Sequence, residues 1–162
     1  IPEIAKKVIE KNENVEFILA GSGEIEKLQE IIAEKGISQY FSFPGWVKKD
    51  EKEKLLKNAD IFFLPSYTEA MPMSILEAMG YGLPIVTTNV GGIPQLVEEG
   101  KNGYMTEPGN IDCFVNVILE LIENDELIYS MGKESIEKAY ENYSLEKHLH
   151  KLCKLYENVL GD

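Results

Sequence analysis

The sequence predicts an α/β protein with a doubly wound, mostly parallel, Rossmann-like sheet and a helical C-terminal tail. Short runs rich in β-branched and aromatic residues alternate with helical patterns over most of the 162 residues. Two of these runs are almost wholly apolar, as is typical of parallel strands that helices cover on both faces. Three helical patterns then follow one another to the end of the chain. This order of elements is typical of an open α/β sheet followed by helices.

The elements can be placed in order by their patterns and by the turn residues between them. Strands are expected at residues 15–20, 40–43, 61–65, 84–88 and 103–106. Helices are expected at residues 2–12, 24–35, 50–58, 73–81, 92–98, 111–123, 125–141 and 144–160. Glycine-rich turns at 21–23 and 91–92 separate the first and fourth strands from the helices that follow them. The last helix has apolar residues at helical spacing, which suits packing either on this domain or on another one.

Composition and charge restrict the classes of protein to which the chain can belong. Apolar residues at 44% and charged residues at 27% are typical of a soluble globular protein, and 162 residues suit one domain. The net charge of −12 disfavours nucleic-acid binding and contact with an anionic membrane. No apolar run is long enough for a membrane span. Cys113 and Cys153 lack metal-site spacing, so we expect reduced core thiols in a cytoplasmic protein.

Ligands of doubly wound sheets bind beyond the carboxyl ends of the strands. Four stretches follow the expected strands and are rich in glycine, serine or exposed polar groups: 21–23, 45–47, 66–74 and 89–93. Because the carboxyl ends of parallel strands share one side of a sheet, we expect these stretches to meet at one rim. The sequence therefore predicts a binding edge there.

The first of these stretches, Gly21-Ser22-Gly23, could present backbone amides to a phosphate at a helix N-terminus. A dinucleotide fingerprint would need a third glycine at position 26, where the chain has Glu26. An NAD site is therefore disfavoured. The alternative is a tight strand-to-helix turn in which glycine allows close packing.

Two glutamates in the third stretch have different alternatives. Ser74 and Glu77 have the spacing of a capping box, in which Ser74 caps the helix and Glu77 returns to its amide. Glu69 lies in a loop before Pro72, where a carboxylate would face water or accept hydrogen bonds from the hydroxyls of a polar ligand. Between these alternatives the spacing does not decide.

The other two stretches also have alternatives in which their residues play a structural role only. Gly91-Gly92 either lets a ligand approach the backbone closely or simply forms a turn. Trp46 is the only tryptophan, and we expect a partly buried residue of the rim there rather than a stacking platform for a ligand.

Taken together, these segments resemble the C-terminal, donor-binding half of the large group-1 (family-4 type) family of retaining glycosyltransferases with the GT-B fold. The matching segments are FILAGSG at 17–23, FPGWV at 43–47, NADIFFLPS at 58–66, EAMPMSILEAMGYGLPIVTT at 69–88, VGGIPQLV at 90–97 and NGY at 102–104. The match covers nearly the whole chain in the right order. The resemblance implies a Rossmann-like nucleotide-sugar-binding domain and a hexosyltransferase activity in the full-length protein.

The family's paired-glutamate motif has seven residues between its acids, as Glu69 and Glu77 do. The resemblance implies that Glu69 contacts the transferred sugar near the reacting carbon, as the catalytic residue, and that Glu77 holds the ribose of the nucleotide. It further implies that backbone amides around Met73 and Ser74 meet the diphosphate. A helix N-terminus suits such an anionic leaving group.

The resemblance also implies roles for the two earlier stretches. The loop from Gly21 to Gly23 would lie close to the sugar and diphosphate, and the nucleobase would lie near Val47, contacted largely by backbone. The donor would be a UDP-, GDP- or ADP-sugar, with no cofactor and no metal required. Ala70-Met71-Pro72 stands where members usually have Gly-Phe-Gly, a change that we expect to affect the choice of substrate.

The family pattern also predicts that this chain, residues 1–162, is part of a longer protein. The usual first strand of the domain, with an Arg and a Lys that neutralise the diphosphate, precedes the match, and so does the N-terminal acceptor domain. That strand would lie between 15–20 and 61–65, so we expect no direct pairing between those two. The helix at 144–160 would cross toward the acceptor domain.

The expected partners follow from the same resemblance. They are a nucleotide sugar and a glycan or lipid-linked acceptor held through the acceptor domain, with no nucleic acid and no membrane contact from this domain. The expected location is the cytoplasm, including its inner membrane face by way of the acceptor domain. A sugar-nucleotide epimerase of the same fold and a non-catalytic nucleotide-binding domain are the alternatives.

Overall fold

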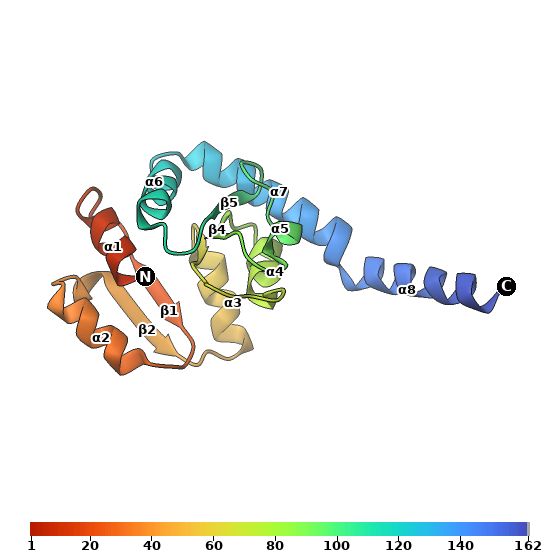
Figure 1. The fold of residues 1–162 in the computed structure, drawn as a ribbon, viewed down its shortest axis with the longest axis horizontal. Coiled ribbons are helices and arrows are strands. Elements are labelled where there is room, and N and C mark those ends of the chain that lie inside the picture. The colour runs from red at the N-terminus through yellow and green to blue at the C-terminus, as the bar shows by residue number, and fades with distance from the viewer. Residues whose placement is uncertain (162) are drawn as a thin grey trace.

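The computed structural model describes residues 1–161, which contain five parallel strands and eight α-helices (Figure 1). As predicted, strands and helices alternate until the last three of these helices end the chain. The strands are β1 (Phe17–Ala20), β2 (Phe41–Gly45), β3 (Phe62–Leu64), β4 (Ile85–Thr88) and β5 (Gly103–Thr106). The helices are α1 (Pro2–Ile9), α2 (Ile25–Glu34), α3 (Lys49–Asn58), α4 (Met73–Gly80), α5 (Ile93–Leu96), α6 (Ile111–Ile122), α7 (Asp125–Tyr143) and α8 (Leu145–Leu160). A 3₁₀ turn at Ser38–Tyr40 precedes β2. The predicted α/β fold with a helical tail is confirmed.

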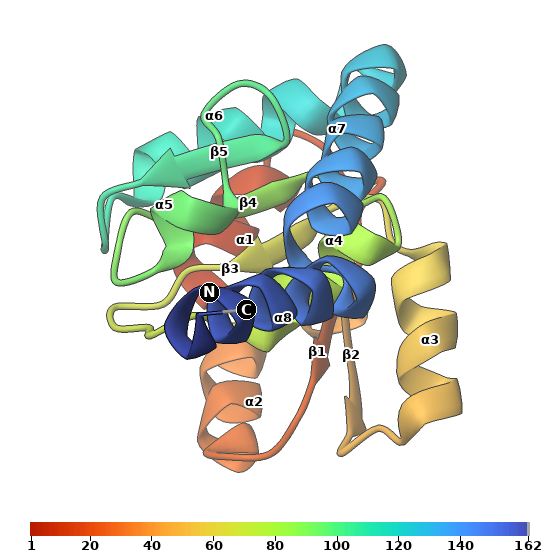
Figure 2. The ribbon, with the colours of Figure 1, turned by 90° about the vertical axis from the view of Figure 1, so that its right-hand side faces the viewer.

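The strands form two sheets rather than one. β1 pairs with β2, and β4 lies between β3 and β5, with every pair parallel. In Figure 2, β3, β4 and β5 run across the view whereas β1 and β2 run down it. Within residues 1–161, β1 and β3 are not hydrogen-bonded neighbours, in agreement with the expectation for 15–20 and 61–65.

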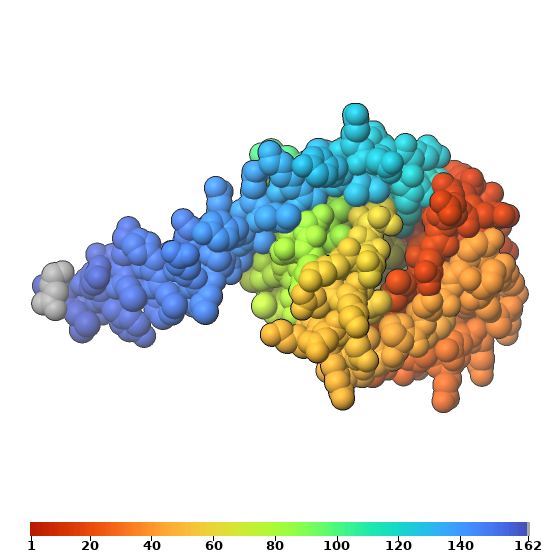
Figure 3. All heavy atoms as spheres, turned by 180° about the vertical axis from the view of Figure 1, so that it is seen from behind, coloured from red at the N-terminus to blue at the C-terminus, as the bar shows by residue number. Residues whose placement is uncertain are grey.

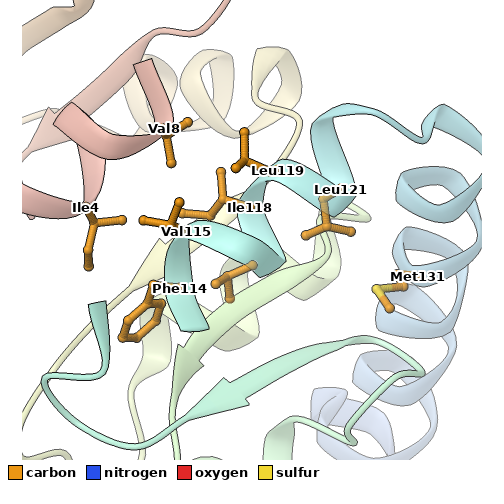
Figure 4. Close-up of a cluster of buried hydrophobic side chains, with 9 residues drawn as sticks. Ile4, Val8, Phe114, Val115, Ile118, Leu119, Leu121 and Met131 are labelled. Carbon is orange, nitrogen blue, oxygen red and sulfur yellow. The ribbon is translucent and has the colours of Figure 1, made fainter. Parts of the chain in front are cut away.

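The second sheet, made of β3, β4 and β5, is better buried than the first sheet, made of β1 and β2. All four residues of β4 are buried, because β4 has strands on both edges and helices on both faces. One core cluster fills the space between α1, α6 and the second sheet, and Figure 4 shows its side chains pointing toward one another. They include Ile4 and Val8 from α1 and Phe114, Val115 and Ile118 from α6. This packing holds the N-terminal helix against the C-terminal half.

The first sheet has a core of its own, built on aromatic residues. The ring centroids of Phe17 and Phe41 lie 5.2 Å apart, and those of Phe41 and Phe43 lie 6.0 Å apart. Their partners include Ile32 of α2 and Ala5 of α1. The other face of β1 is open, and Ile18 is 41% exposed. The first sheet is therefore covered on one face only.

The last three helices begin at side-chain caps. Asn110, Asn124 and Ser144 each accept a hydrogen bond from a backbone amide three residues later. Helix α8 then stands away from the globular body (Figures 1 and 3), and none of its residues is buried.

The expected helix at 92–98 and the expected burial of the two cysteines were wrong. The helix expected at 92–98 is the single turn α5, because Val97 is already extended and Asn102 accepts a hydrogen bond from the Glu98 amide (2.7 Å). Neither cysteine is a core thiol: Cys113 is partly exposed on α6 and Cys153 is exposed on α8. Apolar spacing placed both on helices, but it did not show which face of each helix is covered.

Candidate functional site

The carboxylate of Glu69 is held in place by the loop that follows β3. The Ser66 hydroxyl donates a hydrogen bond to Glu69 Oε1 (2.8 Å), and both side chains are partly exposed. Glu69 Oε1 thus has a partner in the protein, whereas a carboxylate can accept hydrogen bonds at both of its oxygens. The geometry suits recognition of hydroxyl groups.

The backbone of the same loop packs directly against Gly91 and Gly92. The Gly92 amide donates to the Ala70 carbonyl (2.6 Å). A Cβ at position 91 would lie 1.8 Å from the Glu69 carbonyl oxygen, so a side chain there would displace the loop. The close approach that these glycines permit is therefore to the protein's own chain. The tight turn, one of the two alternatives for this pair, is what the structure shows.

Two buried threonines at the end of β4 complete the support and were missed in the sequence. The Thr87 hydroxyl donates to the Leu64 carbonyl (2.8 Å), and the Thr88 hydroxyl donates to the Ser66 carbonyl (2.6 Å). Both threonines are fully buried. The signal that could have found them is a pair of hydroxyls ending a strand that is otherwise apolar and covered on both faces.

Helix α4 begins without the predicted capping box. Its N-cap is Pro72, and within residues 1–161 no side chain caps it. The helix therefore starts one residue before Ser74, and Glu77 lies beyond the position from which a capping glutamate reaches back. Ile75 donates to the Pro72 carbonyl (3.1 Å), which leaves the amides of Met73 and Ser74 ahead of the helical hydrogen bonds. The N-terminus of α4 thus presents free amides beside Met73, which is 64% exposed.

Glu77 has a partner that the sequence analysis missed. Lys52 of α3 donates a hydrogen bond to Glu77 Oε1 (2.6 Å). The pair is partly buried and joins residues 25 positions apart. Because the two residues lie on different helices, no local spacing pattern could have revealed it.

The residues that follow β1 and β2 form the other part of the candidate site. The Gly21 amide donates to the Gly45 carbonyl (2.8 Å), so it is engaged by the backbone and is not free for a phosphate. Gly21 and Gly23 have φ angles of 136° and 141°, which favour glycine. Val47 is partly exposed. Trp46 is 79% exposed and not partly buried as expected, because its side chain extends beyond the end of β2 into solvent.

The structure joins the predicted stretches in pairs. Backbone hydrogen bonds link the stretch at 66–74 to that at 89–93, and the stretch at 21–23 to that at 45–47. The Lys52–Glu77 ion pair connects α3, which follows Val47, to α4. A hollow of about 390 Å³ lies elsewhere, between α7 and the turn that follows α4, around Tyr81, Tyr129 and Ile136. Neither of the two best-defined hollows of the described chain is lined by a candidate site residue.

Two features of other classes of site were not found. Within the described part of the chain, no three side chains of the metal-binding types converge on one point. None of the helices in residues 1–161 is long and apolar enough to cross a membrane.

Comparison with known proteins identifies relatives along almost the whole chain. N-acetyl-alpha-D-glucosaminyl L-malate synthase of Bacillus anthracis is 31% identical over 150 residues, covering 92% of this chain and 39% of the relative. UDP-Gal:alpha-D-GlcNAc-diphosphoundecaprenol alpha-1,3-galactosyltransferase of Escherichia coli is 30% identical over 162 residues, covering 98% and 41%. The chain thus spans about two fifths of the length of these curated relatives.

Solved structures share the fold. S. aureus TarM, crystallised in complex with fondaparinux, alpha-GlcNAc-glycerol and UDP, superposes with a TM-score of 0.84 at 28% identity, covering 96% of this chain and 31% of TarM. The C-terminal domain of the group 1 glycosyl transferase LpcC of Francisella tularensis has a TM-score of 0.80 at 19% identity, covering 89% of this chain and 77% of that one. The latter likeness shows the fold alone.

A family model described as "Glycosyl transferases group 1" matches residues 2–142, which include every candidate site residue. The match extends from α1 to the last residues of α7. With the relatives above, it shows that this chain belongs to the group 1 glycosyl transferase family.

Proposed function

We propose that this chain is the donor-binding domain of a retaining glycosyltransferase that transfers a sugar from a nucleoside diphosphate to a glycan or lipid-linked acceptor. One observation carries the proposal. In the chain Glu69 precedes the N-terminus of α4 and Glu77 lies within α4, and the first amides of this helix have no side-chain cap in the described residues. A helix N-terminus is a ready site for a phosphate, and flanking carboxylates suit the hydroxyls of the two sugars of such a donor.

In this arrangement Glu69 contacts the transferred sugar near the reacting carbon. Its support by Ser66 and by the packed turn at Gly91 means that the carboxylate need not reorganise when the donor binds. Glu77 accepts hydrogen bonds from the ribose. The amides of Met73 and Ser74 meet the diphosphate leaving group, which the positive end of the helix favours.

The residues after β1 and β2 receive the remainder of the donor. The nucleobase lies near Val47, and Gly23 lies near the diphosphate, with Gly21 shaping the turn because its own amide is engaged. The UDP in the TarM complex, a structure 28% identical to this chain, supports a nucleotide donor with a UDP, GDP or ADP leaving group. No metal takes part in the proposed reaction, since helix amides supply the positive potential at the leaving group.

The rest of the cleft belongs, in this proposal, to an acceptor domain in the full-length protein, which works in the cytoplasm or at the inner membrane face. The exposure of Trp46 (79%), Tyr67 (74%) and Met73 (64%), which lie in or next to the candidate stretches, supports a covering part of this kind. So does α8, whose stripe of Leu145, Leu149, Leu152, Tyr156 and Val159 has no buried member. Helix α8 crosses toward that domain.

The test measures sugar transfer by the full-length protein from UDP-, GDP- and ADP-sugars. Glu69→Ala is expected to reduce transfer by about 100-fold or more, because it removes a positioned carboxylate at the reacting sugar. Glu53→Ala is the matched control: Glu53 lies on α3 in an ion pair with Lys57 (2.6 Å), and its loss should leave transfer unchanged. The product is expected to keep the anomeric configuration of the donor. Equal rates for Glu69→Ala and the unmodified protein would refute the role of Glu69.

The two alternatives predict different results in the same assays. An epimerase would convert one nucleotide sugar into another without any acceptor, and a non-catalytic domain would bind the nucleotide without turnover. Nucleotide-sugar turnover that depends on added acceptor supports the transferase.

A further inference from the structure

The ion pair between Lys52 and Glu77 differs from most ion pairs of the molecule. Five pairs join residues three or four positions apart in the chain, where proximity follows from the local backbone. Lys52 and Glu77 come from two helices, α3 and α4, with 2.6 Å between Nζ and Oε1. Among the ion pairs of the described residues, this one contains a candidate site residue.

Stability alone gives little reason for this pair. The side chains are 43% and 39% exposed, and partly exposed pairs add little to folding free energy. Its neighbours on the same helix, Lys49 and Lys54, are exposed, whereas Lys52 is partly buried against α4. The chain contains 16 lysine residues and no arginine, so lysine supplies every cationic side chain.

The two carboxylate oxygens of Glu77 have different surroundings. Lys52 occupies Oε1, and the capping role that the other oxygen could have had is absent because α4 starts at Met73. Within residues 1–161 no hydrogen bond is found at Glu77 Oε2, so this oxygen can accept one from a hydroxyl. The same contact ties α3, which follows Val47, to α4.

We infer that Lys52 is a positioning residue for nucleotide binding, which orients the Glu77 carboxylate toward the ribose. The inference rests on the proposed function, since it needs a ribose at Glu77. Loss of Lys52 then leaves the carboxylate free to rotate, and part of the binding free energy is lost in ordering it again.

The test uses calorimetric titration of the full-length protein with UDP, GDP and ADP, followed by the 2′,3′-dideoxy form of the nucleotide that binds most tightly. Lys52→Met keeps the length of the side chain and removes its charge. It is expected to weaken the ribose nucleotide about threefold to tenfold and the dideoxy nucleotide by less than about twofold. Lys52→Arg, which retains a donor to Glu77, should bind the ribose nucleotide within about twofold of the unmodified protein.

Lys57→Met is the control on the same helix. It removes the same charge, but Lys57 pairs with Glu53 one turn away on α3 (2.6 Å) and not with a residue of α4. Its affinity for both nucleotides should stay within about twofold of the unmodified protein, whereas a loss like that of Lys52→Met would trace the effect to net charge.

The outcomes separate the two claims. Equal weakening of the ribose and dideoxy forms by Lys52→Met, or no weakening of either, would overturn the positioning role while nucleotide binding stands. Failure of the unmodified protein to bind any of the three nucleotides would overturn the proposed function and this inference with it.

Discussion

The half of the molecule built on β3, β4 and β5 and the half built on β1 and β2 differ in how completely their strands are covered. Every residue of β4 is buried, with a paired strand on each edge. In β1, alternate residues are exposed, and within residues 1–161 only one edge is paired. Both halves carry candidate donor-binding residues, but only the half that contains β4 has a strand that is buried along its whole length.

The difference shows which part of the site is preorganised by this chain. Glu69 follows β3, and hydroxyls and amides from β4 and the turn at Gly91-Gly92 hold its loop. Val47 follows β2, and its segment is tied to the better-covered half through Lys52 and Glu77. The sugar end of the proposed donor thus meets a loop that several hydrogen bonds hold, and the nucleobase end meets a segment that one ion pair ties to that half.

The largest difference between the two halves is expected when the same substitution, Ile→Ala, is made in a strand of each. Ile85→Ala in β4 removes a fully buried side chain and leaves a cavity, so a loss of about 2–5 kcal/mol is expected in the free energy of unfolding. Ile18→Ala in β1, where Ile18 is 41% exposed, should cost less than about 1 kcal/mol. Urea denaturation of the two variants measures the difference. Equal losses would mean that the two halves are covered alike in solution.

Two Gly→Ala variants, at Gly91 and at Gly80, test the support of the Glu69 loop, with a smaller expected change in stability. Gly91→Ala places a Cβ 1.8 Å from the Glu69 carbonyl oxygen at a φ of +56°, so a loss of about 2 kcal/mol is expected. Gly80→Ala at the end of α4 has open space and no positive φ, and should be neutral or slightly stabilising. Melting temperatures compare the two variants. If the Gly91→Ala and Gly80→Ala variants have the same melting temperature, the turn at Gly91 does not hold the Glu69 loop.

The smallest effect concerns the link between the halves, where α1 packs on α6. Lys7 donates a hydrogen bond to Asp112 (2.7 Å), which together with its charge holds the pKa of Asp112 below its usual value. Because the folded-state pKa is the lower one, this contribution is present above the unfolded-state pKa and is lost as pH falls through the folded-state pKa.

Asp112→Asn should therefore lower the urea midpoint slightly at pH 7 and have no effect once the pH lies below both pKa values. Lys7→Met should produce the same loss at pH 7, and the double variant no further loss, because both changes remove one interaction. Independent, additive losses would show that the two side chains do not interact in solution.

Much of the fold and part of the candidate site could be predicted from the sequence. Each expected strand is present, because apolar runs bounded by glycine, proline and asparagine encode local structure. Glu69 and Glu77 were found through a motif of fixed spacing, whereas Thr87 and Thr88 were missed because their hydrogen bonds go to a neighbouring strand. The prediction of a capping box was wrong because Pro72 is the N-cap, so that α4 starts at Met73, one residue before Ser74.

The sequence by itself determined the order of strands and helices, the family and the two candidate glutamates, since all of these depend on patterns within short segments. Only the tertiary structure decided that Gly91 accommodates the backbone of Glu69 and that Lys52 pairs with Glu77. The physical reason is the same in each case. These contacts join segments that are distant in the chain, and they exist only when packing of the core brings the segments together.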